Sequence, residues 1–180
     1  MNKNIVILTA EGFQDEEYIY CYYRLTEEGI IPDICTPTGK SVIGKYGVPT
    51  KGNHVTVSML SQEQYKGVLS YDGVVIPGGF EAPGRIRHLS EIITFIQFMD
   101  KCNKPIGAIC HGPQVLISAE IVKGKKVTSY KDVYVDLVNA GAIAYLMAPV
   151  IVDGNIVTSS HYDFNGPFMK AYIELLKQSK

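Results

Sequence analysis

The sequence carries little net charge. Its 17 Lys and Arg residues nearly balance its 18 Asp and Glu residues, which leaves a formal net charge of -1. A chain so close to neutral has no long-range field to attract polyanions or anionic lipid surfaces. We therefore expect neither a nucleic-acid partner nor a membrane partner.

Long apolar runs are also absent. The longest, Ala142 to Val152, is interrupted by Pro149 and is well short of the roughly 18 residues that a membrane-spanning helix needs. The run at the N-terminus, within Met1 to Leu8, is too short for the apolar core of a secretory signal. Both absences predict a soluble, cytoplasmic protein.

Cysteine is scarce and irregularly spaced. The four cysteines, Cys21, Cys35, Cys102 and Cys110, form no C-x-x-C pair, which argues against a zinc knuckle and a thioredoxin-type motif. Reduced thiols in the cytosol fit this pattern best. Neither G-x-G-x-x-G nor G-x-x-x-x-G-K-[ST] occurs at a strand-to-helix turn, which disfavours a flavodoxin-type cofactor protein. We expect no metal and no cofactor.

What is present is a regular alternation of strand-like and helix-like segments. Strands are predicted at 5–8, 32–36, 72–76, 105–109 and in a hairpin over 150–157, and helices at 15–28, 90–99, 114–120 and 164–176. Gly29 and Ser90 are expected to cap two of these helices, and 39–57 reads as a loop and hairpin excursion. The alternation predicts one α/β domain, a flavodoxin-like three-layer sandwich with a mainly parallel sheet.

The most informative junction follows the predicted strand at 105–109. That strand runs directly into Cys110, His111 and Gly112 and then into a helix, so the cysteine is expected on a tight, exposed turn for which Gly112 gives clearance. Pro77-Gly78-Gly79 ends another strand. Ligands bind beyond the carboxyl ends of parallel strands, so the two segments should meet at one site.

This placement predicts the chemistry of Cys110. The helix that follows directs its N–H groups and positive dipole end at the sulfur, so we expect the pKa of Cys110 to lie below that of a free cysteine. The backbone N–H groups of Gly79 and His111 are expected to hold the oxygen of an attacked carbonyl. Cys35 and Cys102 are expected to be buried, inert thiols.

With Ala108-Ile109-Cys110-His111-Gly112-Pro113-Gln114-Val115-Leu116 in place, the sequence resembles the PfpI family of intracellular proteases and amidases, within the DJ-one/ThiJ/PfpI superfamily. Matching segments lie at 13–17, 76–79, 124–130, 139–141 and 152–160. The resemblance implies a single PfpI-like domain over 1–180, with the class I glutamine amidotransferase-like form of the fold. It also implies self-association as homodimers or dimer-based hexamers.

The resemblance implies roles for individual residues. Glu17 looks like the family glutamate that reaches the cysteine sulfur from the first helix, where a protonated carboxyl donates to thiolate; the alternative is a solvated helix charge. In relatives, an acidic residue after the Pro-Gly-Gly loop reaches the histidine across a subunit boundary. Here that position is Gly84, which makes a peptidase-type triad doubtful, although Glu81 lies nearby.

A second departure is His161, where relatives commonly have arginine. It is either a surface histidine or, with Asp163, a base and its orienting carboxylate. We expect Gly78, Gly79 and His161 to bind the substrate or its oxyanion. Gln14, Asp15 and Glu16 are expected to be surface or capping residues.

These residues predict a cysteine-dependent enzyme that acts on a small carbonyl substrate or a peptide. Cys110 attacks, and His111 or Glu17 moves protons. The reaction is either glyoxalase- or deglycase-like, on methylglyoxal-type aldehydes or their adducts, or a peptide or amide hydrolysis; the acid missing at Gly84 favours the former. The alternative function is a redox-sensing or chaperone-like stress-response protein with an oxidisable Cys110.

Overall fold

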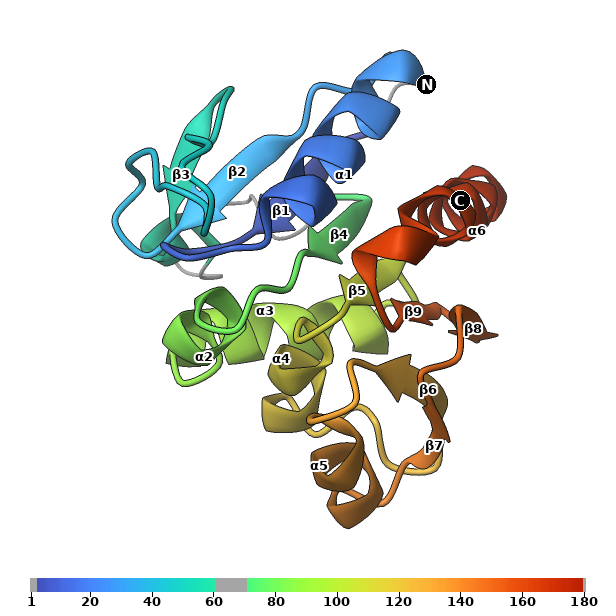
Figure 1. The fold of residues 1–180 in the computed structure, drawn as a ribbon. Helices are drawn as coiled ribbons and strands as arrows, with labels where there is room; N and C mark the ends of the chain where they lie inside the picture. Colours follow the sequence, from blue (N-terminus) through green and yellow to red (C-terminus); the bar gives the residue numbers. More distant parts are fainter. Residues whose placement is uncertain (1–2, 61–70, 180) are drawn as a thin grey trace.

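The computed structural model describes residues 3–60 and 71–179 (Figure 1). Met1 and Asn2 lie outside this range, although they belong to the N-terminal segment, Met1 to Leu8, that contains the short apolar run. The elements in chain order are β1 (Ile5–Leu8), α1 (Asp15–Glu27), β2 (Asp33–Thr36), β3 (His54–Thr56), η1 (Val57–Leu60), β4 (Gly73–Ile76), α2 (Ala82–Ile86), α3 (Ser90–Lys101), β5 (Ile106–Ile109), α4 (Pro113–Ser118), β6 (Lys126–Ser129), α5 (Tyr134–Asn139), β7 (Ile143–Leu146), β8 (Val150–Asp153), β9 (Ile156–Ser159), η2 (Tyr162–Phe164) and α6 (Asn165–Gln178).

A seven-stranded sheet forms the middle layer, in the order β3-β2-β1-β4-β5-β9-β8. Neighbouring strands are parallel except β8 and β9, which are antiparallel. Every residue of β1, β4, β5 and β9 is buried, as expected for parallel strands covered on both faces. The predicted flavodoxin-like α/β sandwich is confirmed.

Helices cover both faces of this sheet. Figure 1 shows α1 and α6 together over one face and α3 with α4 over the other. Helix α1 buries Tyr18, Cys21 and Leu25 and ends as predicted at Gly29, where φ is +77° and the N–H of Ile30 donates to the Leu25 carbonyl. Within the described residues, no helix has the length and apolarity needed to cross a membrane.

One local prediction is wrong, and a second is confirmed only in part. Ser90 does not cap α3: Leu89 occupies the N-cap position, and the Ser90 hydroxyl donates to the Glu91 carboxylate. The segment 39–57 contains only one antiparallel bridge, Ile43 to Pro49, and its last part forms β3, which extends the sheet in parallel to β2.

The C-terminal third brings one hairpin next to the cysteine turn. The predicted hairpin is confirmed as β8 and β9, and β9 pairs in parallel with β5. Before it, α5 and a small parallel sheet of β6 and β7 occupy a stretch where no helix or strand was predicted. The carboxyl ends of β4, β5 and β9 therefore lie side by side, where the site forms.

Candidate active site

Cys110 sits on a sharp turn between β5 and α4. Its φ is +61°, a left-handed conformation that L residues adopt at an energetic cost of order 1–3 kcal/mol. Two backbone hydrogen bonds hold it there: the Cys110 N–H donates to the Ser159 carbonyl at 2.9 Å, and the Tyr130 N–H donates to the Cys110 carbonyl at 3.0 Å. The turn is thus fixed by segments far along the chain.

Glycines make this turn possible. A Cβ atom on Gly112 would lie 2.4 Å from the Ile76 carbonyl oxygen, so only glycine fits there. A Cβ on Gly78 would lie 2.8 Å from the Cβ of Cys110 and 2.9 Å from a Glu17 oxygen. The loop after β4 therefore packs directly against the turn, and the two segments converge as predicted.

The imidazole of His111 faces the sulfur. Its Nδ1 lies 3.2 Å from Cys110 Sγ, a separation at which a hydrogen bond to sulfur forms. Neighbours on a turn usually point apart, and here remote rings hold the imidazole: Tyr130 stacks on it at 5.3 Å between centroids and Phe80 contacts it edge-on at 5.8 Å. Only 6% of His111 is exposed.

The second nitrogen of His111 has a carboxylate partner that the sequence analysis missed. Nε2 lies 3.1 Å from Oδ2 of Asp132, whose side chain is 48% exposed. Asp132 follows β6, a strand outside the main sheet, so the rule for carboxyl edges could not indicate it. The Tyr130–Cys110 backbone bond draws this segment onto the turn.

Glu17 lies on the other side of the sulfur. It is fully buried on α1, and its Oε2 accepts a 2.6 Å hydrogen bond from the Gly78 N–H. Burial raises the pKa of its carboxyl to about 8, while the Gly78 N–H and the Cys110 side chain oppose the rise. Glu17 is therefore mostly protonated at neutral pH. Gly78 was expected to bind the substrate, but its N–H donates to the Glu17 carboxyl instead.

The resting thiol of Cys110 is not acidic, contrary to expectation. Burial raises its pKa above that of a free cysteine, and Glu17 adds to the rise; the backbone N–H groups of Gly79 and His111 oppose it. Loss of water solvation outweighs the N–H groups because the sulfur is nearly enclosed, with 6% of the residue exposed. A proton acceptor must therefore assist its ionisation.

Several other expectations need correction. Asp15 is buried rather than on the surface, and its carboxylate accepts hydrogen bonds from the N–H groups of Tyr46 and Val48, both at 2.9 Å. It thus shapes the loop between β2 and β3. Gln14 is also buried, but it occupies the N-cap position of α1, which is the capping alternative given for it. Cys102, expected to be buried, is exposed.

Within the described part of this single chain, Glu81 has no hydrogen bond or ion pair with His111. Its carboxylate pairs with Arg85 one turn along the chain, and both side chains are exposed. A Cβ on Gly84 would meet nothing within 4 Å. Neither Glu81 nor position 84, which is a glycine, gives His111 a carboxylate partner within the described residues, whereas Asp132 does.

His161 contributes to the site wall. Its Nδ1 lies 3.0 Å from Asp163 Oδ2, so the expected imidazole–carboxylate pair is present. Its ring stacks on Tyr130 at 5.8 Å, and Tyr130 in turn stacks on His111. His161 therefore borders the pocket and is separated from His111 by the ring of Tyr130.

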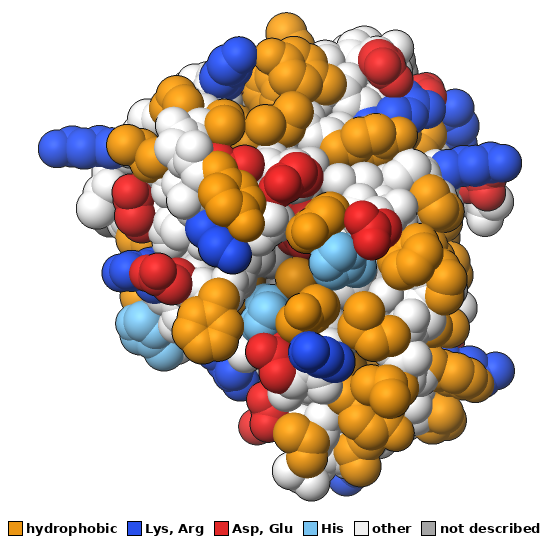
Figure 2. Space-filling model, in the orientation of Figure 1, with side chains coloured by type: hydrophobic (Ala, Val, Ile, Leu, Met, Phe, Trp, Pro, Cys, Tyr) orange, Lys and Arg blue, Asp and Glu red, His pale blue; other side chains and the backbone are white. Residues whose placement is uncertain are grey.

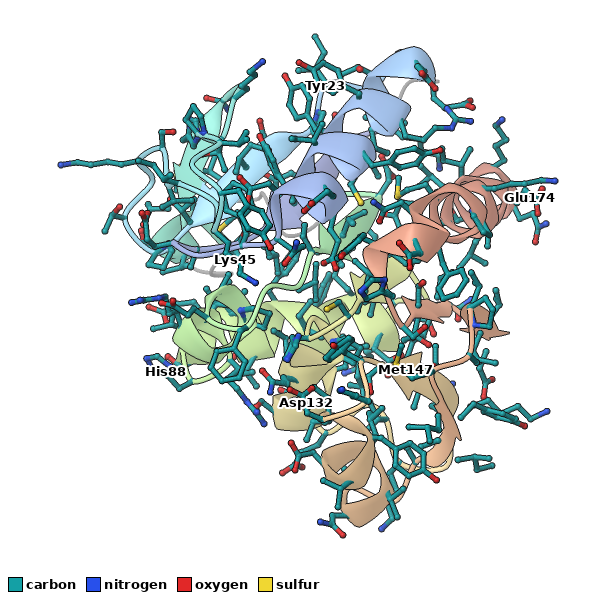
Figure 3. All side chains as sticks on the ribbon, viewed as in Figure 1. Tyr23, Lys45, His88, Asp132, Met147 and Glu174 are labelled. Carbon is teal, nitrogen blue, oxygen red and sulfur yellow. The ribbon has the colours of Figure 1, made fainter. Side chains whose placement is uncertain are left out.

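A pocket of about 360 Å³ opens above Cys110. Figure 2 shows a hollow at the centre of this face with histidine side chains beside it. Figure 3 labels two lining residues that come from separate segments, Lys45 from the loop before β3 and Asp132 from the segment after β6. The remaining lining residues are Gln14, Tyr46, Gly79, Phe80, Cys110, His111, Tyr130, His161 and Tyr162. In the part of the chain described, no group of His, Cys, Asp and Glu is arranged to hold a metal.

Known proteins resemble this chain along its whole length. It is 37% identical over 173 residues to a deglycase of Pyrococcus horikoshii, which covers 96% of this chain and 99% of that protein. It is 32% identical over 177 residues to protein/nucleic acid deglycase 2 of Escherichia coli, covering 98% and 99%.

A solved structure also resembles this chain in its fold. A two-domain protein of Anabaena variabilis with DJ-1/ThiJ/PfpI-like and ferritin-like domains superposes with a TM-score of 0.88 at 30% identity, over 98% of this chain and 48% of that one. This chain thus spans about half of that protein. The family model described as DJ-1/PfpI family matches residues 3–175. The chain belongs to the DJ-1/PfpI family.

Proposed function

We propose that this chain is a cysteine-dependent enzyme that converts methylglyoxal-type aldehydes, and the adducts they form with amines, into hydroxy acids. One observation carries the proposal: Cys110 Sγ lies at the floor of a pocket, 3.2 Å from the imidazole of His111 and beside the protonated carboxyl of Glu17. The names of two relatives, both deglycases, support the same type of reaction.

The first step is attack on the aldehyde carbon. His111 Nδ1 accepts the thiol proton, and Sγ bonds to the carbon while the aldehyde oxygen takes a proton, which gives a hemithioacetal. The backbone N–H groups of Gly79 and His111, which point toward the sulfur, are close enough to stabilise the oxygen as its negative charge develops.

The second step moves a proton between neighbouring carbons. The carbon bound to sulfur loses its hydrogen as a proton, the adjacent carbonyl carbon gains a proton, and the hydroxyl proton on the first carbon moves to the carbonyl oxygen of the second. The first carbon then carries the carbonyl group of a thioester of the hydroxy acid. Glu17 suits this transfer because its pKa of about 8 lies near neutral pH. Water then hydrolyses the thioester. One carbon is oxidised as its neighbour is reduced, so no external oxidant is consumed.

The test is lactate formation from methylglyoxal by the wild type and by Cys110→Ser. We expect the variant to lose activity, and Cys102→Ser, at the exposed cysteine, to keep it. If the wild type forms no lactate while peroxide adds oxygen only at Cys110, the redox-sensor alternative is correct. Both functions use the same Cys110 thiol, so these two readouts distinguish them.

Peptide or amide hydrolysis and self-association as a dimer or hexamer remain further proposals. Light scattering coupled to size-exclusion chromatography measures the oligomer directly. A fluorogenic peptide library, assayed with the wild type and Cys110→Ser, measures the hydrolysis.

A further inference from the structure

We propose that Asp132 is a positioning residue that completes a Cys110–His111–Asp132 triad within one chain and thereby allows the site to expel nitrogen leaving groups. This inference rests on the proposed function and extends it to a class of substrate. Two observations carry it: Asp132 Oδ2 lies 3.1 Å from His111 Nε2, and the acidic side chain expected from the loop after β4 is missing at Gly84.

The two contacts of His111 determine which ring nitrogen carries the hydrogen. Asp132 is a carboxylate acceptor, so Nε2 carries the hydrogen and Nδ1 presents its lone pair to the Cys110 sulfur. When Nδ1 takes the thiol proton, the imidazolium lies between the new thiolate and the Asp132 carboxylate. Both neighbours stabilise its positive charge.

The imidazolium matters more for some substrates than for others. When the thiolate adds to a free aldehyde, the product is an alkoxide, which is basic enough to take a proton from water or from Glu17. An amine or guanidino nitrogen cannot leave as an anion, so it must receive a proton as its bond to carbon breaks. A positioned imidazolium supplies that proton.

The adduct of methylglyoxal with such a nitrogen is a carbinolamine, N–CH(OH)–CO–CH₃. Sγ bonds to the carbinol carbon, the C–N bond breaks with its electron pair going to nitrogen, and the thiol proton passes through His111 Nδ1 to that nitrogen. The products are the free amine and the same hemithioacetal that methylglyoxal forms directly. The later steps are then shared by both substrates.

The experiment compares the two substrates on the intact protein. Rates are measured with free methylglyoxal and with its preformed adduct with Nα-acetylarginine, for which release of the guanidino compound is counted above spontaneous dissociation without enzyme. We expect Asp132→Asn to lower kcat for the adduct by about 10²-fold. The same substitution should lower kcat for methylglyoxal by less than about 10-fold. Asp132→Glu, which keeps the charge on an exposed side chain, should restore adduct turnover in part.

Asp136→Asn is the matched control, because this exposed residue lies one turn further along the same segment and the substitution removes the same charge. It should behave as the wild type with both substrates. Equal losses on both substrates in Asp132→Asn, or no loss, would overturn the proposal. Failure of the proposed function is distinct, since it appears as wild-type protein that is inactive on methylglyoxal itself.

Discussion

The protonated state of Glu17 predicts how stability depends on pH. Burial raises the pKa of this carboxyl from 4.5 to about 8, whereas in the unfolded chain it returns to its ordinary value. Between these two values the folded state keeps the proton and the unfolded state has lost it, so rising pH favours unfolding. The free energy of unfolding should fall by a little over 1 kcal/mol per pH unit from this group, or about 2–3 kcal/mol between about pH 5.5 and 7.5.

Glu17→Gln removes this dependence, because an amide of the same shape stays neutral at every pH in the range. Urea unfolding at several pH values gives the free energy of unfolding of each protein, and the wild type should lose stability relative to Glu17→Gln as pH rises. Glu174→Gln is the control: Glu174 is exposed on α6, and its variant should follow the wild type. Parallel curves for Glu17→Gln and the wild type would refute a buried, proton-holding Glu17.

Four further substitutions test the packing of the fold. Gly112→Ala should cost several kcal/mol or prevent folding, because its Cβ would overlap the Ile76 carbonyl, whereas Gly84→Ala, with open space and a helical position, should raise the melting temperature slightly. Asp15→Asn leaves one of two loop N–H groups without its acceptor and should cost about 1–3 kcal/mol in urea unfolding. Tyr172→Phe should leave the melting temperature unchanged or raise it, because the buried hydroxyl has no partner among the described residues; a large decrease would show a missing contact.

The cysteine turn was predictable because its signals are local. An apolar strand, a cysteine, a glycine and a helix follow one another without a spacer, and each needs only its neighbours to be interpreted. The clearance at Gly112 follows from the tight turn. The convergence with Gly78 and Gly79 follows from the rule that ligands bind beyond the carboxyl ends of parallel strands. The buried strands were equally clear, since parallel strands covered on both faces appear as short continuous apolar runs.

The electrostatics of the site were not predictable, because they depend on groups far apart in the chain. The direction of the His111 ring is set by Phe80 and Tyr130, and its carboxylate partner, Asp132, belongs to a segment outside the main sheet. The pKa of Cys110 depends on how completely the folded chain excludes water from the sulfur. No local pattern reports that exclusion, so the dipole of a short helix was given too much weight.

The hydrogen bond from the Cys110 N–H to the Ser159 carbonyl has a consequence for biosynthesis. Ser159 is translated after Cys110, so until β9 has emerged from the ribosome the nascent polypeptide carries Cys110 without this hydrogen bond. A product truncated before β9 has the nucleophile in its sequence but lacks the strand that shapes its turn. The shape of the cysteine turn thus depends on a strand that is synthesised well after the cysteine itself.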